Sequence, residues 1–350
     1  MRTKNLHVCT LNKFIPPFWK MVQAQFSMKD QKFWIKGDFD QYPMPDSPSI
    51  YKARNGTAGL SYLKLAKEMN LADKIILHGL FDIRIVLLLW MMPWIHAKCY
   101  WVLWGGDLYV KRNGPKNLRW KIKEFFKAPI IKNLRAIITT VPGDYDLARK
   151  WYKTKADFIH SLMYGSHVAR RHEVKNKKNP NIINIQIGNS ADPENRHAEA
   201  FHMIQDLIKD RVLNIYCPLS YGDQRYAQET ARIGREMFGS YFNSMTRFMT
   251  FDEYNKYLSS VDVAIFNHRR QQAMGNIVGL LSMGKTVYLR PSETPFQYFK
   301  KLGIVVRNIE DIGCGIYLLS DEEVKNNVTL MQDFFSEEKL VQSWEAIFRE

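Results

Sequence analysis

The sequence is poor in cysteine and has no apolar run long enough to cross a membrane. The longest such run, residues 85–95, spans 11 residues and contains Pro93, whereas a spanning helix needs about 20. The N-terminus lacks the apolar core and cleavage site of a signal peptide. Four scattered cysteines form no CxxC pair and have no histidine at zinc-ligand spacing, which excludes a disulfide framework and a zinc site: Cys9, Cys99, Cys217 and Cys314. These absences predict a protein of the reducing cytoplasm. Residues 85–95 are interpreted as a buried helix, with shallow membrane contact as the alternative.

Charge, by contrast, is abundant and unevenly placed. The chain has 350 residues and a formal net charge of +15. Residues 111–178 hold 18 basic and 5 acidic residues, whereas residues 179–350 hold 18 basic and 22 acidic residues. This asymmetry indicates an anionic partner for the first half of the chain, either nucleic acid or an anionic membrane surface.

Short apolar segments that end in polar or glycine-containing turns predict two series of strands. The first series lies at 6–11, 33–35, 75–78, 99–104 and 136–141. It includes a helix at 60–72 whose expected apolar face holds Leu60, Leu63, Leu65, Ala66 and Met69. The second series lies at 181–186, 212–216, 247–249, 261–266 and 286–289, with helices at 197–210, 225–238, 252–260 and 276–283. Alternating strands and helices predict parallel α/β layers.

The interruption between the two series predicts a domain boundary. We expect α/β domains at 1–165 and 181–320, a basic linker at 166–180 and a helical tail at 321–350. A helix beginning near Glu337 is expected to pack back on the first domain. Two facing domains imply a cleft, and ligands of open α/β sheets bind at the carboxyl ends of the strands.

Loops that follow strands of the second domain suit an anionic ligand. A turn with exposed backbone N–H groups can accept a phosphate or a sugar hydroxyl, with an ordinary capped turn as the alternative. Two guanidiniums beside a helix N-terminus complement a diphosphate, with a solvated basic loop as the alternative. The next strand-exit loop suits base stacking or a simple turn. The candidate donor-binding residues in these loops are Gly188, Asn189, Ser190, Ser220, Tyr221, Arg269, Arg270, Gln271, Gln272, Gly275 and Asn276.

The first domain offers two candidates for a general base. His78 and Asp107 each follow a predicted strand, and an imidazole or a carboxylate in a dry cleft can be tuned toward neutral pH. Hydrogen-bonded scaffolding is the alternative for the histidine, and a turn or helix cap is the alternative for the aspartate.

A basic helix with an aromatic and aliphatic face is predicted within residues 116–135. Such a helix binds anionic lipid headgroups. The alternatives are nucleic acid and a solvated helix packed on the core. Because no zinc finger, RRM or helix-turn-helix signature accompanies the charge, we favour the membrane. The expected membrane-binding residues are Arg119, Trp120, Lys121, Lys123, Phe126 and Lys127.

Five motifs together resemble a known family. They are ILHGLFD (76–82), WVLWGGDLY (101–109), IQIGNSADPENRH (185–197), FMTFDEYNKYLSSVDVAIFNHRRQQAMGNI (248–277) and GKTVYLRPSETPF (284–296). In order and spacing they are similar to the bacterial TDP-N-acetylfucosamine:lipid II N-acetylfucosaminyltransferases. That family adds 4-acetamido-4,6-dideoxygalactose to a polyprenyl-diphosphate-linked saccharide in enterobacterial common antigen assembly. O-antigen and other surface-glycan pathways are the alternatives for an enzyme with these motifs.

The resemblance implies a GT-B fold, in which two Rossmann-like domains face each other across a cleft. The first domain would bind the acceptor and the second the nucleotide-sugar, which is a substrate, with no cofactor and no essential metal. The resemblance also implies a peripheral enzyme at the cytoplasmic face of the inner membrane. By motif position, the strand-exit residues above and Glu293 would contact the donor, and His78 and Asp107 would serve the acceptor side.

One departure limits this transfer of roles. The paired glutamates of many GT-B donor helices are absent, and Gln271 and Gln272 stand near the place of the first. An amide can hydrogen-bond sugar hydroxyls but cannot act as a carboxylate. Two alternatives remain: a nucleotide-sugar epimerase of the same fold, and a nucleic-acid-binding protein.

Overall fold

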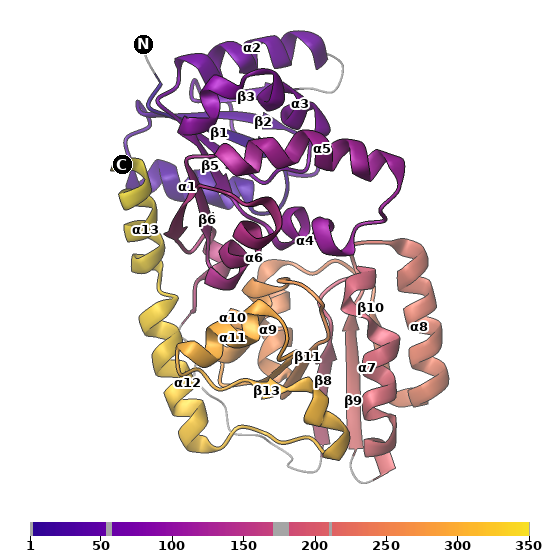
Figure 1. Cartoon of the computed structure of the whole chain (residues 1–350). Coiled ribbons are helices and arrows are strands. Elements are labelled where there is room, and N and C mark those ends of the chain that lie inside the picture. Colours follow the sequence, from indigo (N-terminus) through magenta and orange to yellow (C-terminus); the bar gives the residue numbers. More distant parts are fainter. Residues whose placement is uncertain (1–2, 54–57, 171–181, 210–211, 350) are drawn as a thin grey trace. The chain divides into compact units, whose positions relative to one another are not determined.

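The computed structural model describes residues 3–53, 58–170, 182–209 and 212–349. The chain divides into two compact units, residues 1–166 together with 337–350, and residues 167–336 (Figure 1). Most of the expected linker at 166–180 lies outside the described residues. The expected tail at 321–350 is divided, because its first part belongs to the second unit and residues 337–350 belong to the first.

The first unit is built on a parallel sheet of seven strands in the order β3-β2-β1-β4-β5-β6-β7. Its strands are β1 (Asn5–Thr10), β2 (Gln31–Lys36), β3 (Ile50–Ala53), β4 (Lys74–His78), β5 (Cys99–Val102), β6 (Ala136–Thr139) and β7 (Asp157–His160). Its helices are α1 (Ile15–Gln25), α2 (Ala58–Leu71), α3 (Ile83–Met91), α4 (Gly105–Asn113), α5 (Leu118–Asn133), α6 (Pro142–Tyr152) and α13 (Glu337–Arg349), with short 3-10 helices η2 (Pro93–Lys98) and η3 (Gly165–His167).

The second unit repeats this plan with a parallel sheet of six strands in the order β10-β9-β8-β11-β12-β13. Its strands are β8 (Ile182–Ile187), β9 (Val212–Pro218), β10 (Phe242–Met245), β11 (Val263–Phe266), β12 (Thr286–Leu289) and β13 (Arg307–Asn308). Its helices are α7 (His197–Ile204), α8 (Gln224–Phe238), α9 (Phe251–Ser260), α10 (Met274–Ser282), α11 (Thr294–Lys301) and α12 (Asp321–Phe334), with 3-10 helices η4 (Pro193–Asn195), η5 (Gln205–Lys209), η6 (Gly239–Tyr241) and η7 (Ile309–Cys314).

Both sheets reverse their strand order once, which creates a crevice for ligands at the carboxyl ends of the strands. In the first unit the reversal lies between β1 and β4, and in the second it lies between β8 and β11. The expected parallel α/β layers are therefore confirmed. Each sheet packs its apolar side chains into a separate core, as the buried Trp101 and Ile137 do in the first unit and Ile185 and Ile265 do in the second.

Three details differ from the sequence-based expectations. On α2, Leu60 and Leu63 are exposed, and the buried face consists of Leu65, Met69 and their neighbours. The strand expected at 247–249 lies instead at Phe242–Met245, paired with β9. The edge strands β3 and β7 were not predicted, because their residues alternate weakly in polarity and are largely exposed or half-buried.

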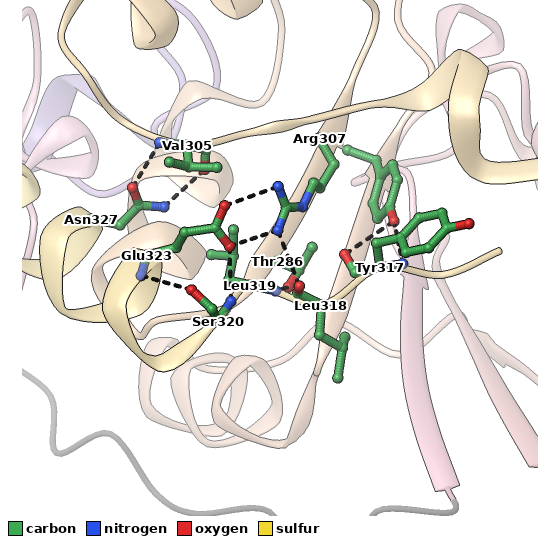
Figure 2. A network of polar contacts seen from close by, with 10 residues as sticks. Thr286, Val305, Arg307, Tyr317, Leu318, Leu319, Ser320, Glu323 and Asn327 are labelled. Carbon is green, nitrogen blue, oxygen red and sulfur yellow. Dashed lines mark hydrogen bonds and ion pairs between the residues drawn. The ribbon is translucent and has the colours of Figure 1, made fainter. Parts of the chain in front are cut away.

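The far edge of the second sheet is held by a polar network that Figure 2 shows. Arg307 of β13 donates to both carboxylate oxygens of Glu323, at 3.0 and 2.6 Å, and to the carbonyl of Leu318 at 3.1 Å. Glu323 also completes a capping box with Ser320 at the start of α12. One turn later, Asn327 exchanges two hydrogen bonds with the backbone of Val305. The two-residue strand is thereby fixed by side chains of a helix.

Residues 85–95 form most of α3 and the start of η2, and this run is buried only in part. Ile85, Val86, Leu89, Met92 and Ile95 are buried as expected, whereas Trp90, Met91 and Trp94 are exposed. Within the described residues, every helix is too short or too polar to span a lipid bilayer.

Candidate active site

The strand reversal of the second unit brings together loops from β8, β9 and β11. Gly188 follows β8 with a φ of +68°, and its N–H donates to the carbonyl of Ile265 in β11. A Cβ at this position would lie 2.5 Å from Nε2 of His197 and 2.7 Å from Oδ1 of Asn195. Only glycine fits here, because the backbone is left-handed and the neighbouring side chains leave no space.

The buried side chain of Asn195 organises the β8 loop. Its Oδ1 accepts the N–H of Asn189 at 3.0 Å and the ring N–H of His268 at 2.7 Å. Its Nδ2 donates to the carbonyls of Ser190 and Asp192. Asn195 was not predicted as a site residue, although it lies within the quoted motif 185–197.

Asn189 connects three strand-exit loops. Its Nδ2 donates to the hydroxyl of Tyr221 at 3.1 Å, and its Oδ1 accepts from Nε2 of Gln272 at 3.2 Å. Ser220 lies beside Tyr221 and is half-buried. The geometry thus unites residues that the sequence placed in separate motifs.

A small pocket lies at the carboxyl ends of β11 and β12. It combines apolar walls with a few charged and polar groups. Its lining residues are Phe266, His268, Arg270, Gln272, Ile277, Leu289, Arg290, Glu293, Pro295 and Phe296. The predicted residues Arg270, Gln272 and Glu293 are among them.

Arg290 is a pocket residue that sequence reasoning missed. It directly follows β12 within the quoted motif 284–296, and its side chain is almost buried. Its guanidinium donates to Glu199 of α7 and to the carbonyl of Asn267. The signal available in the sequence was an arginine immediately after a buried strand.

Arginines outnumber the acidic partners that contact them around this pocket. Glu199 is shared by Arg290, by Arg196 at 2.5 Å and by Arg269 at 3.8 Å. Arg270 pairs with Asp192 at 2.8 Å. Partial burial disfavours the charged form of Glu199, but these guanidiniums hold its pKa below the usual value.

The remaining predicted donor residues lie around α10. Gln271 is buried ahead of this helix. The helix begins at Met274, and Ala273 before it adopts a left-handed backbone and has no side-chain group that can cap the helix. Gly275 therefore lies in the first turn, where N–H groups point toward the pocket end of the sheet. Asn276 accepts a hydrogen bond from the hydroxyl of Tyr254.

The two candidate bases lie inside the first unit. Asp107 is buried in the first turn of α4, and its carboxylate accepts N–H groups of Leu80, Trp101 and Trp104 at 2.8 to 2.9 Å. Burial raises its pKa to about 6 despite these donors and the nearby Lys127. One carboxylate thus ties the loop after β4 to strand β5 and to the turn that follows β5, an arrangement that favours a positioning role.

His78 lies at the end of β4 in a buried chain of hydrogen bonds. Its Nε2 is 3.0 Å from Nδ1 of His7, and its Nδ1 is 2.8 Å from the hydroxyl of Tyr164. His7 in turn contacts Gln31 at 3.0 Å. Burial, reinforced by His7, holds the pKa of His78 well below its usual value, so the imidazole is neutral. His7 and Tyr164 were not predicted.

The predicted membrane-binding residues occupy different environments on α5. Arg119 and Lys121 are exposed and Lys123 is half-buried. Trp120 and Phe126 are half-buried, and the indole of Trp120 donates to the carbonyl of Val110. The prediction is wrong for Lys127, which is fully buried and donates to the backbone carbonyl of Asp107. In the described part of the chain, no group of three or more His, Cys, Asp or Glu side chains is placed to hold a metal ion.

Structures of known glycosyltransferases share this fold. WaaG, a glycosyltransferase of lipopolysaccharide biosynthesis, matches with a TM-score of 0.62 and 9% identity over 98% of each chain. The apo structure of OtsA matches with a TM-score of 0.61 and 10% identity over 99% of this chain and 98% of that one. The N-terminal domain of Candida albicans trehalose-6-phosphate phosphatase matches with a TM-score of 0.65 and 10% identity over 100% of this chain and 97% of that one.

The expected GT-B architecture is therefore confirmed, as is the resemblance stated from the motifs. Residues 31–306 match the family described as 4-alpha-L-fucosyltransferase, glycosyl transferase group 56. This match covers more than half of the sequence, and the chain belongs to that family of glycosyltransferases.

Proposed function

We propose that the protein transfers an N-acetylfucosamine-type deoxyamino sugar from a TDP-like nucleotide to a polyprenyl-diphosphate-linked saccharide. The reaction would serve a bacterial surface glycan such as enterobacterial common antigen or O-antigen. The enzyme would work as a peripheral protein at the cytoplasmic face of the inner membrane. The observation that carries the proposal is the arginine-rich pocket at the strand reversal of the second unit.

The pocket suits a nucleoside diphosphate because its charge excess is positive and local. Arg270 and Arg290 line it, and each is held in place by a carboxylate, Asp192 or Glu199. Guanidiniums pair with phosphate oxygens in a forked geometry. Fixed positive charge there would stabilise the diphosphate as it leaves with the electron pair of the broken sugar–oxygen bond.

The amide network beside the pocket suits the sugar. Asn189 and Gln272 present hydrogen-bonding groups from two loops, and both are already oriented by contacts to Tyr221 and to each other. Such oriented amides can bind sugar hydroxyl and acetamido groups without a carboxylate.

For the proton of the attacking hydroxyl, His78 is the better of the two candidates. Its imidazole is neutral, although burial weakens it as a base, whereas both carboxylate oxygens of Asp107 accept N–H groups of the fold. His78 and its partner Tyr164 are both buried, so the proton would have to pass along this chain of hydrogen bonds. A folded His78→Gln enzyme that keeps the wild-type turnover and pH profile would contradict this assignment.

The donor site is tested by calorimetry with TDP and a panel of nucleotide-sugars. Removing a buried guanidinium from a charged hydrogen bond costs about 1.5 to 3 kcal/mol, so Arg270→Gln and Arg290→Gln should each weaken binding at least about tenfold. Arg247→Gln is the matched control, because Arg247 pairs with Glu253 on the exposed side of α9. If all three variants bound the nucleotide with the same affinity, the pocket would be excluded as the donor site.

Product analysis then identifies the reaction. Incubation of the bound nucleotide-sugar with a polyprenyl-diphosphate-linked saccharide should give a longer lipid-linked glycan and the nucleoside diphosphate. An altered nucleotide-sugar formed without any acceptor would instead identify an epimerase.

A further inference from the structure

Large apolar side chains are exposed together on helices α3 and α5 and on the 3-10 helix η2. Trp94 of η2 is 66% exposed, and Phe125 of α5 is 69% exposed. Burying such residues in the core would be the usual outcome, so a cluster of them on the surface marks a contact site. We name this surface the α3–α5 face, and it consists of Trp90, Met91, Trp94, Leu118, Ile122 and Phe125.

Contacts join the α3 and α5 residues of this surface, whereas the indole of Trp94 donates to Asn70 of α2 at 2.9 Å. Figure 1 shows α3 and α5 side by side in the first unit, and their residues pack together. The ring of Trp90 meets Phe126 edge-on at 4.9 Å, and Phe126 in turn contacts Phe125 at 5.3 Å. Along α5, Leu118, Ile122 and Phe125 follow a spacing of four and three residues, which places them in one stripe.

The charged side chains that residues 81–133 expose to solvent are basic. Residues 81–133 contain ten basic and three acidic residues. All three acids are turned inward: Asp107 and Glu124 are buried, and Asp82 pairs with Lys36 at 2.6 Å. The basic residues Arg119 and Lys121 are exposed on α5 between the apolar positions.

We propose that the α3–α5 face docks on an anionic lipid bilayer, with Trp94 and Phe125 entering the headgroup region. The inference deepens the proposed function, on which it rests for its biological purpose, because a lipid-linked acceptor is held in the bilayer. Aromatic and aliphatic side chains ringed by cations match the interface between headgroups and acyl chains. A nucleic acid would use the cations and the rings but not the aliphatic stripe of Leu118 and Ile122.

This surface differs from the one that the sequence indicated. The sequence placed Lys127 among the lipid contacts, but Lys127 is inside the fold. Trp120, also predicted, covers Gly114, where a Cβ would lie 2.5 Å from its indole nitrogen. The residues that replace them, Trp94 and Phe125, became visible only when α3 and α5 were placed together.

The test is co-sedimentation of the full chain with vesicles, without donor or acceptor. Vesicles of phosphatidylcholine alone are compared with vesicles containing 30% phosphatidylglycerol, at about 150 mM salt, where only close charges act strongly. The double variant Trp94→Ser/Phe125→Ser removes the aromatic contacts. Phe248→Ser is the matched control, because Phe248 of the second unit is also 66% exposed. A second pair, Arg119→Gln/Lys121→Gln, removes two charges.

We expect binding to the anionic vesicles only. Each removed charge should weaken it about fivefold, and the aromatic double variant about tenfold or more, while Phe248→Ser binds like the wild type. Equal binding by the wild type and the aromatic variant would overturn the proposal. The proposal would also be overturned if the protein bound an oligonucleotide but showed no difference between the two kinds of vesicle. Self-association of the wild type that the aromatic variant abolishes would overturn it as well. Because no substrate is present, failure here leaves the donor-binding experiment unaffected.

Discussion

At the scale of single residues, the second unit is organised by side chains that hold loops rather than by side chains that face solvent. The side chain of Asn195 makes five hydrogen bonds within the β8 loop and with His268, and it is fully buried. Losing a buried partner of this kind costs more than the bonds themselves contribute, because the groups left behind are also desolvated. The β8 loop therefore depends on residues that need not touch a ligand.

Gly188 offers the sharpest test of this loop. Gly188→Ala places a Cβ against His197 and Asn195 and forces alanine into a left-handed backbone, which alone costs about 1–2 kcal/mol. We expect a lower melting temperature and weaker binding of TDP, measured by scanning calorimetry and titration calorimetry. Gly59→Ala is the control, because a Cβ there meets nothing within 4 Å on helix α2, and alanine favours the helix. A Gly188→Ala protein as stable as the wild type would show that the loop adapts.

Residue positions were predictable from the sequence where a motif and a strand end coincide. Gly188, Asn189 and Arg270 lie beyond the ends of β8 and β11 as expected, and their contacts with a donor stay a prediction. Arg290 was passed over although it follows a strand directly, because a single arginine carries no spacing pattern. Lys127 was misplaced for a different reason: its burial depends on Asp107, a contact across 20 residues that helical periodicity does not contain.

At the scale of elements, strands in the middle of each sheet were predicted and edge strands were not. Central strands such as β12, expected at 286–289 and found there, are buried on both faces and appear as continuous apolar runs. The edge strand β7 has mostly exposed side chains, so its sequence resembles a loop. The strand expected at 247–249 was wrong because Phe248, apolar but exposed, suggested burial.

The C-terminal helix α13 was predicted with its starting residue, and its packing on the first unit has a measurable consequence. Trp344 is fully buried against Phe18 at 4.7 Å and against His78, and it donates to the carbonyl of Met163. Trp344→Ala should cost about 3–5 kcal/mol of unfolding free energy, because a large cavity remains.

Native-state hydrogen exchange locates this loss. Amides of β1 and β4 should exchange faster in Trp344→Ala, while those of β8 and β11 should keep their protection, since the two sheets have separate cores. Trp94→Ala, at an exposed site, should change stability by no more than about 0.5 kcal/mol. Uniform acceleration in both sheets would mean that the units unfold together.

At the scale of the whole molecule, the buried histidines set how the protein responds to acid. Burial lowers the pKa of His7, His167 and His197 to about 4, and it holds those of His78 and His268 well below their usual value. These imidazoles are divided between the two units. Both units should therefore lose stability over the same pH range.

The direction in which stability changes with pH follows from proton binding in the folded and unfolded states. Between the ordinary pKa of 6.5 and about 4, the unfolded chain protonates these imidazoles while the folded chain leaves them neutral, so stability falls as the pH falls. Each histidine contributes about 1.4 kcal/mol per pH unit in this window. Asp107 acts in the opposite sense between about pH 6 and its ordinary 3.8, because burial makes the folded state bind its proton first. Asp107 therefore offsets the loss of stability that about one histidine causes.

Unfolding by guanidinium chloride at pH 7.5, 6.5 and 5.5 measures the sum of these contributions to the free energy of unfolding. We expect a modest loss between the first two values and a steeper loss between the last two. His7→Gln removes one buried imidazole, so its loss over that last interval should be smaller by about 1 kcal/mol, even if the variant is less stable throughout. An equal slope in both proteins would show that His7 takes up its proton in the folded state over the same pH range as in the unfolded chain. Nδ1 of a charged His7 would then have to donate to Nε2 of His78.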